Sequence, residues 1–228
     1  GISETVGTPE LAVAAVQRSS ALKLDMLKSY VREDYTTQKT IIAEAHKTGI
    51  PISGHELYPA LANGADQMEH FGATSRRGYS TKISRLNRTY DDVISLLAKS
   101  GMIITPTLAL QTGNGARIDP AVLATLKKMY NSGVNIMAGV DSPFVTFADT
   151  LHTEMRLYSM AGVPNSVVLR IATSGNASLL NADNEIGSVE PGKVADLILI
   201  DGDPLANITD TLKVTWTMKN GVVVWEKK

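Results

Sequence analysis

Four ionisable residues stand at or directly after short apolar runs of this chain: Lys28, His55, His70 and Asp141. Two imidazoles and a carboxylate in one pocket suit Zn²⁺ or a similar divalent ion, because neutral imidazole nitrogens and carboxylate oxygens are its usual ligands. Such an ion supplies a hydroxide nucleophile at neutral pH. The residue types therefore predict metal-dependent hydrolysis.

Each of these residues, taken alone, has a simpler explanation. A histidine at a strand end is more often a hydrogen-bonded surface residue, and an aspartate before Ser-Pro is often a turn or a helix cap. A lysine can extend its ammonium group to water. The metal hypothesis gains weight because all four residues stand at the same end of consecutive predicted strands.

The chain alternates between helical and extended patterns. Apolar spacing predicts helices at 10–20, 36–47, 91–99, 120–131, 148–160 and 164–179. The predicted strands lie at 22–31, 50–54, 67–69, 102–105 and 134–140. Such alternation indicates parallel strands joined by crossover helices. No glycine-rich phosphate loop follows the first strand, so a (β/α) barrel is favoured over a doubly wound sheet.

The pattern changes from Glu185 onward. Strands are predicted at 195–200, 214–218 and 222–225, and Asn220-Gly221 is a hairpin signal between the last two. This region is a separate β element. A complete barrel needs about 250 residues, so we expect the first barrel strands to lie outside this sequence.

Composition narrows the class of partner. The 228 residues are 43% hydrophobic with a net charge of -1, which is typical of a globular chain and argues against nucleic acid or membrane as the main partner. A small-molecule or peptide substrate is expected instead. The absence of cysteine excludes disulfides, thiolate nucleophiles and cysteine zinc sites, and it leaves both a cytoplasmic and an exported location open.

Several motifs point to a known family. They are DMLKSYVR at 25–32, SGHEL at 53–57, MEH at 68–70, GVDS at 139–142 and GSVEPGKVADL at 187–197, the last being the most specific. Over nearly its whole length the chain resembles imidazolonepropionase-like and prolidase-like metal-dependent amidohydrolases, above all those fused behind a β-propeller.

The resemblance implies a (β/α)8 TIM-barrel-like fold that is incomplete at its N-terminus, over 1–180, and the C-terminal part of a composite β-sandwich over 181–228. It also implies that Lys28 reacts with CO₂ to give a carbamate bridging two metals. His55 and His70 would hold one metal and Asp141 the other, so one or two divalent ions, expected to be zinc, are implied. The chemistry agrees, because an ammonium is repelled at a metal site whereas a carbamate is an anion with two oxygen ligands.

One feature departs from the family. Its members also use a His-x-His pair at the end of the first barrel strand, and this chain has none. Of the other histidines, His46 is expected on the solvent face of a helix with a structural role, and His152 near the rim with at most a minor one. Without the pair, metal affinity falls. We expect this chain to hold little metal and to associate with another copy or with the N-terminal part.

Two further residues are candidates for substrate binding. Arg76 stands in a loop at 72–90 that is rich in arginine, and its guanidinium could hold a substrate carboxylate by a two-pronged contact. Such a run is more often solvated or paired, and we favour that interpretation. Tyr58, three residues after His55, could reach a substrate carbonyl, or it could be a buried ring with a hydrated hydroxyl.

Together these features predict a hydrolase that breaks a C–N bond in a peptide or cyclic amide. Asp141 would deprotonate the attacking water and pass the proton to the leaving nitrogen. Two alternatives stay open: a non-catalytic barrel that serves binding or assembly, and a deaminase of the same superfamily.

Overall fold

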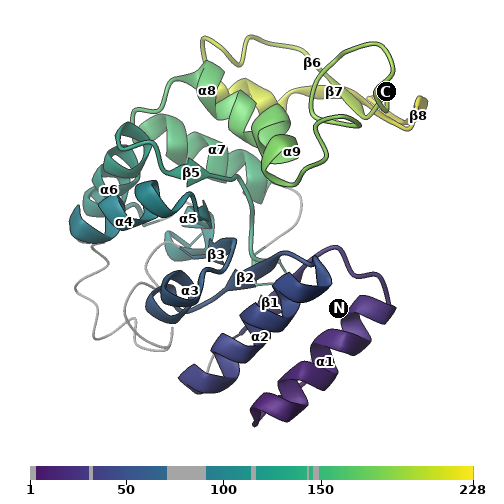
Figure 1. Cartoon of the computed structure of the whole chain (residues 1–228). Coiled ribbons are helices and arrows are strands. Elements are labelled where there is room, and N and C mark those ends of the chain that lie inside the picture. The colour runs from purple at the N-terminus through teal and green to yellow at the C-terminus, as the bar shows by residue number, and fades with distance from the viewer. Residues whose placement is uncertain are drawn as a thin grey trace. The chain divides into compact units, whose positions relative to one another are not determined.

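The computed structural model describes residues 4–30, 33–70, 91–113, 117–142, 144–145 and 149–227 (Figure 1). Packing divides the chain into two compact units. The first unit is Gly1–Pro106 with Asn131–Asn135, and the second unit is Thr107–Tyr130 with Ile136–Lys228. This division differs from the expected boundary at residue 180, which stays a prediction.

The first unit is built on a parallel sheet. Its strands follow the chain in the order β1 (Leu27–Ser29), β2 (Ile52–Gly54), β3 (Gln67–Glu69) and β4 (Ile103–Thr105), and β5 (Asn135–Ile136) stands last in the sheet order. The pairings from β1 to β4 are parallel. The helices are α1 (Pro9–Ala21), α2 (Tyr35–Thr48), α3 (Leu57–Asn63) and α4 (Asp91–Ser100). The prediction of an α/β chain with a parallel sheet is confirmed.

Helix α2 shows how the sequence defines one crossover. Asp34 caps its first turn by accepting hydrogen bonds from the backbone N–H groups of Thr36 (2.9 Å) and Thr37 (3.0 Å). Gly49 ends the helix with a left-handed φ of 75°. The apolar face includes the fully buried Ile42, the helix contacts β1 and β2, and α1 lies beside it (Figure 1). Truncating Ile42 to alanine would cost about 2–5 kcal/mol.

The sequence analysis does not predict helix α3. Gly54 explains how this helix can pack against the end of β2. A Cβ atom added to Gly54 would lie only 2.5 Å from the Cβ atom of Ala60. The missing side chain therefore lets α3 approach the end of β2 closely. The sequence signal was weak, because Glu56 at the start of the helix makes no side-chain cap hydrogen bond and the helix has only seven residues.

The second unit combines helices with an antiparallel sheet. Its helices are α5 (Leu108–Gln111), α6 (Pro120–Asn131), α7 (Thr150–Met160), α8 (Asn165–Arg170) and α9 (Asn176–Leu179). A π-helical turn, Ile171–Gly175, joins α8 to α9, so the helix predicted at 164–179 contains a register change. The strands β6 (Leu197–Ile200), β7 (Val214–Lys219) and β8 (Val222–Glu226) pair in that order and antiparallel.

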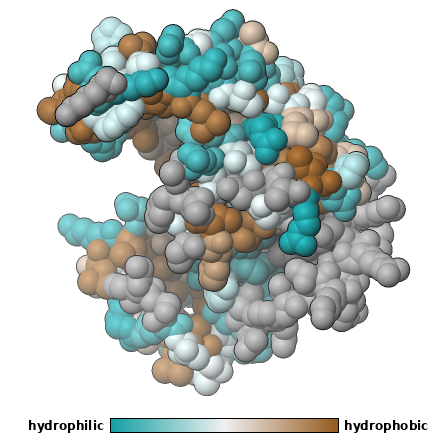
Figure 2. All heavy atoms as spheres, turned by 180° about the vertical axis from the view of Figure 1, so that it is seen from behind, coloured by the Kyte–Doolittle hydropathy of each residue, from teal (hydrophilic) through white to brown (hydrophobic). Residues whose placement is uncertain are grey.

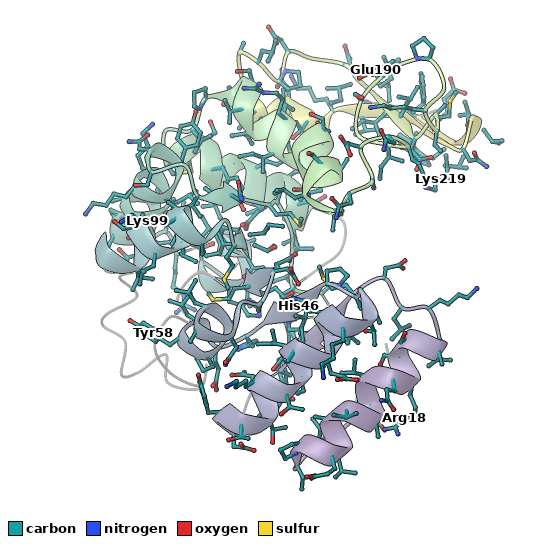
Figure 3. All side chains as sticks on the ribbon, in the orientation of Figure 1. Arg18, His46, Tyr58, Lys99, Glu190 and Lys219 are labelled. Atoms are coloured by element: carbon teal, nitrogen blue, oxygen red, sulfur yellow. The ribbon has the colours of Figure 1, made fainter. Side chains whose placement is uncertain are left out.

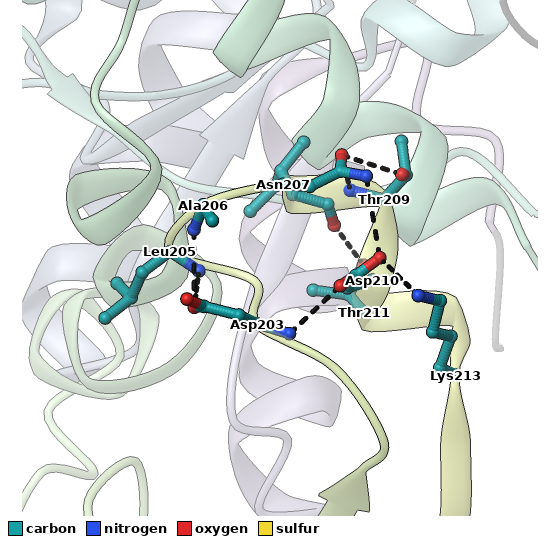
Figure 4. A network of polar contacts seen from close by, with 9 residues as sticks. Asp203, Leu205, Ala206, Asn207, Thr209, Asp210, Thr211 and Lys213 are labelled. Carbon is teal, nitrogen blue, oxygen red and sulfur yellow. Dashed lines mark hydrogen bonds and ion pairs between the residues drawn. The ribbon is translucent and has the colours of Figure 1, made fainter.

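A polar network organises the loop between β6 and β7 (Figure 4). The Asp203 carboxylate accepts hydrogen bonds from the backbone N–H groups of Leu205 (3.0 Å) and Ala206 (3.3 Å). The Asp210 carboxylate accepts one from the N–H of Asp203 (2.9 Å) and pairs with Lys213 (2.9 Å). The network includes the short 3-10 helix Ile208–Leu212. The two carboxylates accept hydrogen bonds from loop N–H groups that are not paired in a strand.

Two predicted strands are shorter than expected. The strand predicted at 22–31 is confined to Leu27–Ser29 within the described residues, because the N–H groups of Leu22, Lys23 and Leu24 bond back to the end of α1. The strand predicted at 134–140 covers only Asn135–Ile136. Beyond Ile136, side chains from helices of the second unit bind the backbone groups in place of a strand neighbour.

Candidate active site

The ends of β2 and β3 bring two predicted ligands together in the first unit. The imidazole rings of His55 and His70 lie edge to face, with 4.7 Å between centroids and 61° between planes. The two strands are parallel neighbours, with Gly54 beside Met68. Within the first unit, the ends of these two strands thus place the two histidines side by side, and their role as metal ligands stays a prediction.

His70 turns toward His55 through an unusual backbone conformation. Successive side chains of a strand alternate between faces, so His70 would otherwise point away from the face used by Glu69. Its φ is 69°, in the left-handed region that residues other than glycine rarely adopt. Backbone strain of this kind gathers at functional sites.

Lys28, at the centre of β1, lies on the face of the sheet that also carries Ser53 and Glu69. Its ammonium pairs with the Glu69 carboxylate at 2.5 Å, and the Ser53 hydroxyl donates a hydrogen bond to the other carboxylate oxygen, also at 2.5 Å. Lys28 is the register partner of Ser53. The sequence marks Glu69 only as a strand residue. The signal that could reveal its role is the parallel register, which places Lys28, Ser53 and Glu69 on one face.

His55 is buried, with 8% of its surface exposed, and its surroundings keep it neutral. Burial, followed by the neighbouring His70 and Lys28, lowers the pKa of His55 to about 4. Its Nδ1 atom is buried and has no hydrogen-bond partner among the described residues. The ring of Tyr30 stands edge-on at 5.0 Å, and Tyr30 also lies 5.5 Å from the Lys28 ammonium. A neutral imidazole with a free lone pair is the form that binds metals.

Asp141 belongs to the second unit, where its carbonyl accepts a hydrogen bond from the N–H of Val145 at 3.2 Å. The hydroxyl of Ser142 is buried and has no hydrogen-bond partner in the described part of the chain. The prediction that Asp141 shares a site with Lys28, His55 and His70 joins the two units and stays a prediction.

Four candidates remain, of which Tyr58 and His46 are labelled in Figure 3. Tyr58 lies on α3 and is 46% exposed, so the alternative of a buried ring is wrong. Arg76 falls outside the described residues. His46, on α2, pairs with Asp66 at 3.1 Å, which agrees with a structural role. His152 bonds Thr211 at 2.9 Å, and burial lowers its pKa.

The amidohydrolase family model matches residues 22–224. The chain belongs to the amidohydrolase family. The match covers the parallel sheet and, in the second unit, the antiparallel sheet up to residue 224 within β8. The expected family is therefore confirmed.

Individual amidohydrolases differ in activity. Imidazolonepropionase from Treponema denticola is 30% identical over 184 residues, which cover 78% of this chain and 39% of that protein. A 5-methylthioadenosine/S-adenosylhomocysteine deaminase from Thermoanaerobacter pseudethanolicus is 34% identical over 90 residues, covering 35% and 21%. A solved Xaa-Pro dipeptidase with bound methionine superimposes with a TM-score of 0.78 at 22% identity, over 97% of this chain and 59% of that one. The chain thus spans less than half the length of these two curated relatives.

Amidohydrolases are generally metal-dependent, and the residues present supply part of the ligand set that a divalent metal needs. The free Nδ1 of His55 and the adjacent ring of His70 are suitable donors. Across the described ranges, no group of three or more His, Cys, Asp or Glu side chains comes together as a metal site.

The described residues also contain no helix that has both the length and the apolar character needed to cross a bilayer.

Proposed function

We propose that this amidohydrolase chain contributes to a metal-dependent hydrolase that breaks a C–N bond in a peptide or a cyclic amide. Its parallel sheet would be part of a (β/α)8 barrel, and β6 to β8 part of a β-sandwich. The family membership supports hydrolysis of a C–N bond, since imidazolonepropionase and Xaa-Pro dipeptidase are among the similar proteins. Those similar proteins are named as enzymes, so a non-catalytic module is not favoured.

The observation that most supports this proposal is the pairing of His55 with His70. The buried Nδ1 atom of His55 has no hydrogen-bond partner among the described residues, which is costly unless a ligand binds it. His70 reaches this position at the cost of a left-handed backbone. A site that only stabilised the fold would be expected to use apolar residues with ordinary φ values here.

Lys28, His55, His70 and Asp141 would hold the metal, expected to be zinc. When bound, a divalent ion supplies a Lewis acid that makes water nucleophilic near neutral pH. As an ammonium, Lys28 is neutralised by Glu69. If Lys28 is carbamylated, this pair must open, because two anions at 2.5 Å would repel each other. Among the described residues, the Ser53 hydroxyl would still hold Glu69.

In this proposal the protein groups position the substrate and move one proton. The Asp141 carboxylate accepts a proton from the attacking water and returns it to the leaving nitrogen, so that the amide becomes a carboxylic acid and an amine. Tyr30 and Tyr58 are both about half exposed in the first unit and are available for substrate contacts. Arg76 stays a candidate for binding a substrate carboxylate.

Deamination is the second candidate, favoured by the similarity to 5-methylthioadenosine/S-adenosylhomocysteine deaminase. It also breaks a C–N bond by attack of water, but the leaving group is ammonia from a purine ring. The two reactions are distinguished by their products. Release of ammonia from an adenine nucleoside supports deamination, and release of an amine or ring opening supports amide hydrolysis.

A paired measurement of zinc and turnover tests the proposal. The purified protein is titrated with Zn²⁺ and assayed on dipeptides, cyclic amides and adenine nucleosides. Replacement of His55 by alanine should lower Zn²⁺ affinity at least about tenfold and abolish turnover. The matched control is His46→Ala, a histidine of the same unit that pairs with Asp66, and it should leave zinc binding unchanged. A wild type that binds zinc, together with a His55→Ala variant that binds it with equal affinity, would rule the proposal out.

A further inference from the structure

The segment that leads to Asp141 is held by side chains rather than by a neighbouring strand. After β5 ends at Ile136, the carbonyl of Met137 accepts a hydrogen bond from the Tyr158 hydroxyl at 3.0 Å. The next residue, Ala138, is bonded twice by the side chain of Asn176. Its N–H donates to Asn176 Oδ1 at 2.9 Å, and its carbonyl accepts from Asn176 Nδ2 at 2.7 Å.

This double contact imitates a strand partner. A side-chain amide offers one acceptor and donors in the same plane, as a peptide group does. Asn176 therefore satisfies both backbone groups of Ala138, which is 6% exposed and would otherwise leave them buried without a partner. Because both groups are bound to one rigid amide, the backbone orientation at Ala138 is fixed.

A π-helical turn lies directly before Asn176. The turn Ile171–Gly175 immediately precedes Asn176, and a Cβ atom at Gly175 would lie 2.8 Å from the carbonyl oxygen of Arg170. The wider turn changes the register of the residues that follow it. On the other side of Asn176, Ala177 is buried so closely that a Cβ atom at Gly187 would lie 2.5 Å from its own. The chain thus fixes Asn176 from both sides, and π turns of this kind are frequent at functional sites.

We propose that Asn176 is a positioning residue for Asp141. It fixes the backbone three residues before the carboxylate, and the hydrogen bond from Val145 N–H to the Asp141 carbonyl fixes the chain after it. The catalytic significance of this arrangement rests on the proposed function, in which Asp141 moves the proton. Small displacements of a reacting group reduce turnover strongly, so an indirect support of this kind affects the rate.

The 228-residue chain offers a matched control. Asn165 is also half-buried in the second unit and also makes two side-chain hydrogen bonds, accepting from Ser159 at 2.7 Å and donating to the Leu205 carbonyl at 3.0 Å. Neither of these hydrogen bonds is made to the segment that leads to Asp141. Asn176→Ala and Asn165→Ala therefore remove equal numbers of hydrogen bonds at different places. Asn176→Asp is a second, isosteric variant that retains the shape but opposes an oxygen to the Ala138 carbonyl.

Hydrogen exchange measured by mass spectrometry on the full chain is the first readout. Asn176→Ala and Asn176→Asp should each speed exchange in the peptide 136–145 at least about tenfold, while Asn165→Ala leaves that peptide within about twofold of wild type. If both Asn176 variants exchange there like wild type or like Asn165→Ala, the positioning role is wrong. If Asn176→Ala fails to fold, the isosteric variant decides.

The second readout is whether the substitution changes kcat or KM, each measured separately on the best substrate of the proposed function. Asn176→Ala should lower kcat at least about tenfold and leave KM within about twofold, because the affected group acts in the chemical step. An unchanged kcat contradicts the inference. If the wild-type protein turns over no substrate, the proposed function fails, whereas the exchange result still decides whether Asn176 positions the segment.

Discussion

The imidazole of His70 meets that of His55 at 4.7 Å between ring centroids, and His70 does so with a left-handed φ of 69°. His55 is not among the residues with positive φ. The contact thus joins one residue without a positive φ, just beyond the end of β2, to one whose backbone is strained. Strain of this kind persists only where the surroundings impose it.

The strain at His70 predicts that glycine is more stabilising than alanine at this position, the reverse of their usual order. His70→Gly should be about 1 kcal/mol more stable than His70→Ala, because glycine adopts positive φ without a steric penalty. Both variants lack the ring, so their difference in free energy of unfolding isolates the backbone. Urea denaturation followed by circular dichroism measures it.

Position 55 is the control for this comparison. There His55→Gly should be less stable than His55→Ala, since glycine loses more conformational freedom on folding. A His70→Ala variant as stable as His70→Gly would show that the left-handed backbone is not required.

Much of this arrangement could be predicted from the sequence, because its signals are local. The limits of α2 follow from the Asp34 cap and from Gly49, and α6 begins at Pro120 and ends before Gly133 as predicted. The positions of His55 and His70 follow from two short parallel strands, since the strand ends share one edge of a sheet.

The parts that could not be predicted depend on residues far apart in the chain. The strand predicted at 134–140 stops early because Asn176 binds Ala138, and no local pattern reveals that contact. The left-handed φ of His70 has no signal in a histidine, which usually avoids that region. The partnership of Lys28 with Glu69 requires knowledge of the register between strands.

Glu154 predicts a dependence of stability on pH. Its side chain is fully buried and accepts hydrogen bonds from the N–H groups of Leu108 (2.9 Å) and Ala109 (2.7 Å). Burial raises the pKa of Glu154 to about 7 from an ordinary value of 4.5. The folded state therefore binds the proton more tightly than the unfolded state. The stabilisation is complete below pH 4.5 and is lost as the pH rises through 7, by an amount on the order of 3 kcal/mol.

Replacement of Glu154 by glutamine should remove this dependence. The variant should be less stable than wild type at pH 5 by about 1–3 kcal/mol, because one buried N–H loses its acceptor. The gap should narrow by pH 8, where wild type must hold a buried charge. Thermal unfolding at both pH values measures the gap, with the exposed Glu226→Gln as the control. Parallel pH profiles for wild type and Glu154→Gln would contradict the assignment.

Asp141→Asn should reduce turnover far more than it disturbs folding. The substitution nearly preserves shape but removes a proposed ligand and the proton carrier, so kcat should fall at least about a hundredfold. The free energy of unfolding should change by less than about 1 kcal/mol. Asp183→Asn, at an exposed position of the same unit, should leave both quantities near wild type. Full activity in Asp141→Asn would remove the residue from the mechanism.

The antiparallel sheet predicts self-association. Val222, Val223, Val224 and Trp225 are each at least 50% exposed, and β8 stands at the end of the order β6-β7-β8. Figure 2 shows hydrophobic residues at the molecular surface, and β8 is among the elements that supply them. An apolar strand at a sheet edge offers backbone groups and apolar area to another chain, so the protein should associate with itself at micromolar concentration.

A single added charge tests whether β8 is the contact. Val224→Lys should shift the sedimentation profile toward the monomer by weakening association at least about tenfold, because a lysine on an edge strand opposes pairing. The control is Ala124→Lys, which adds the same charge at an exposed position of α6 in the same unit. If both variants sediment like wild type, association uses another surface. A wild type that is monomeric throughout the micromolar range would show that the exposed strand does not drive assembly.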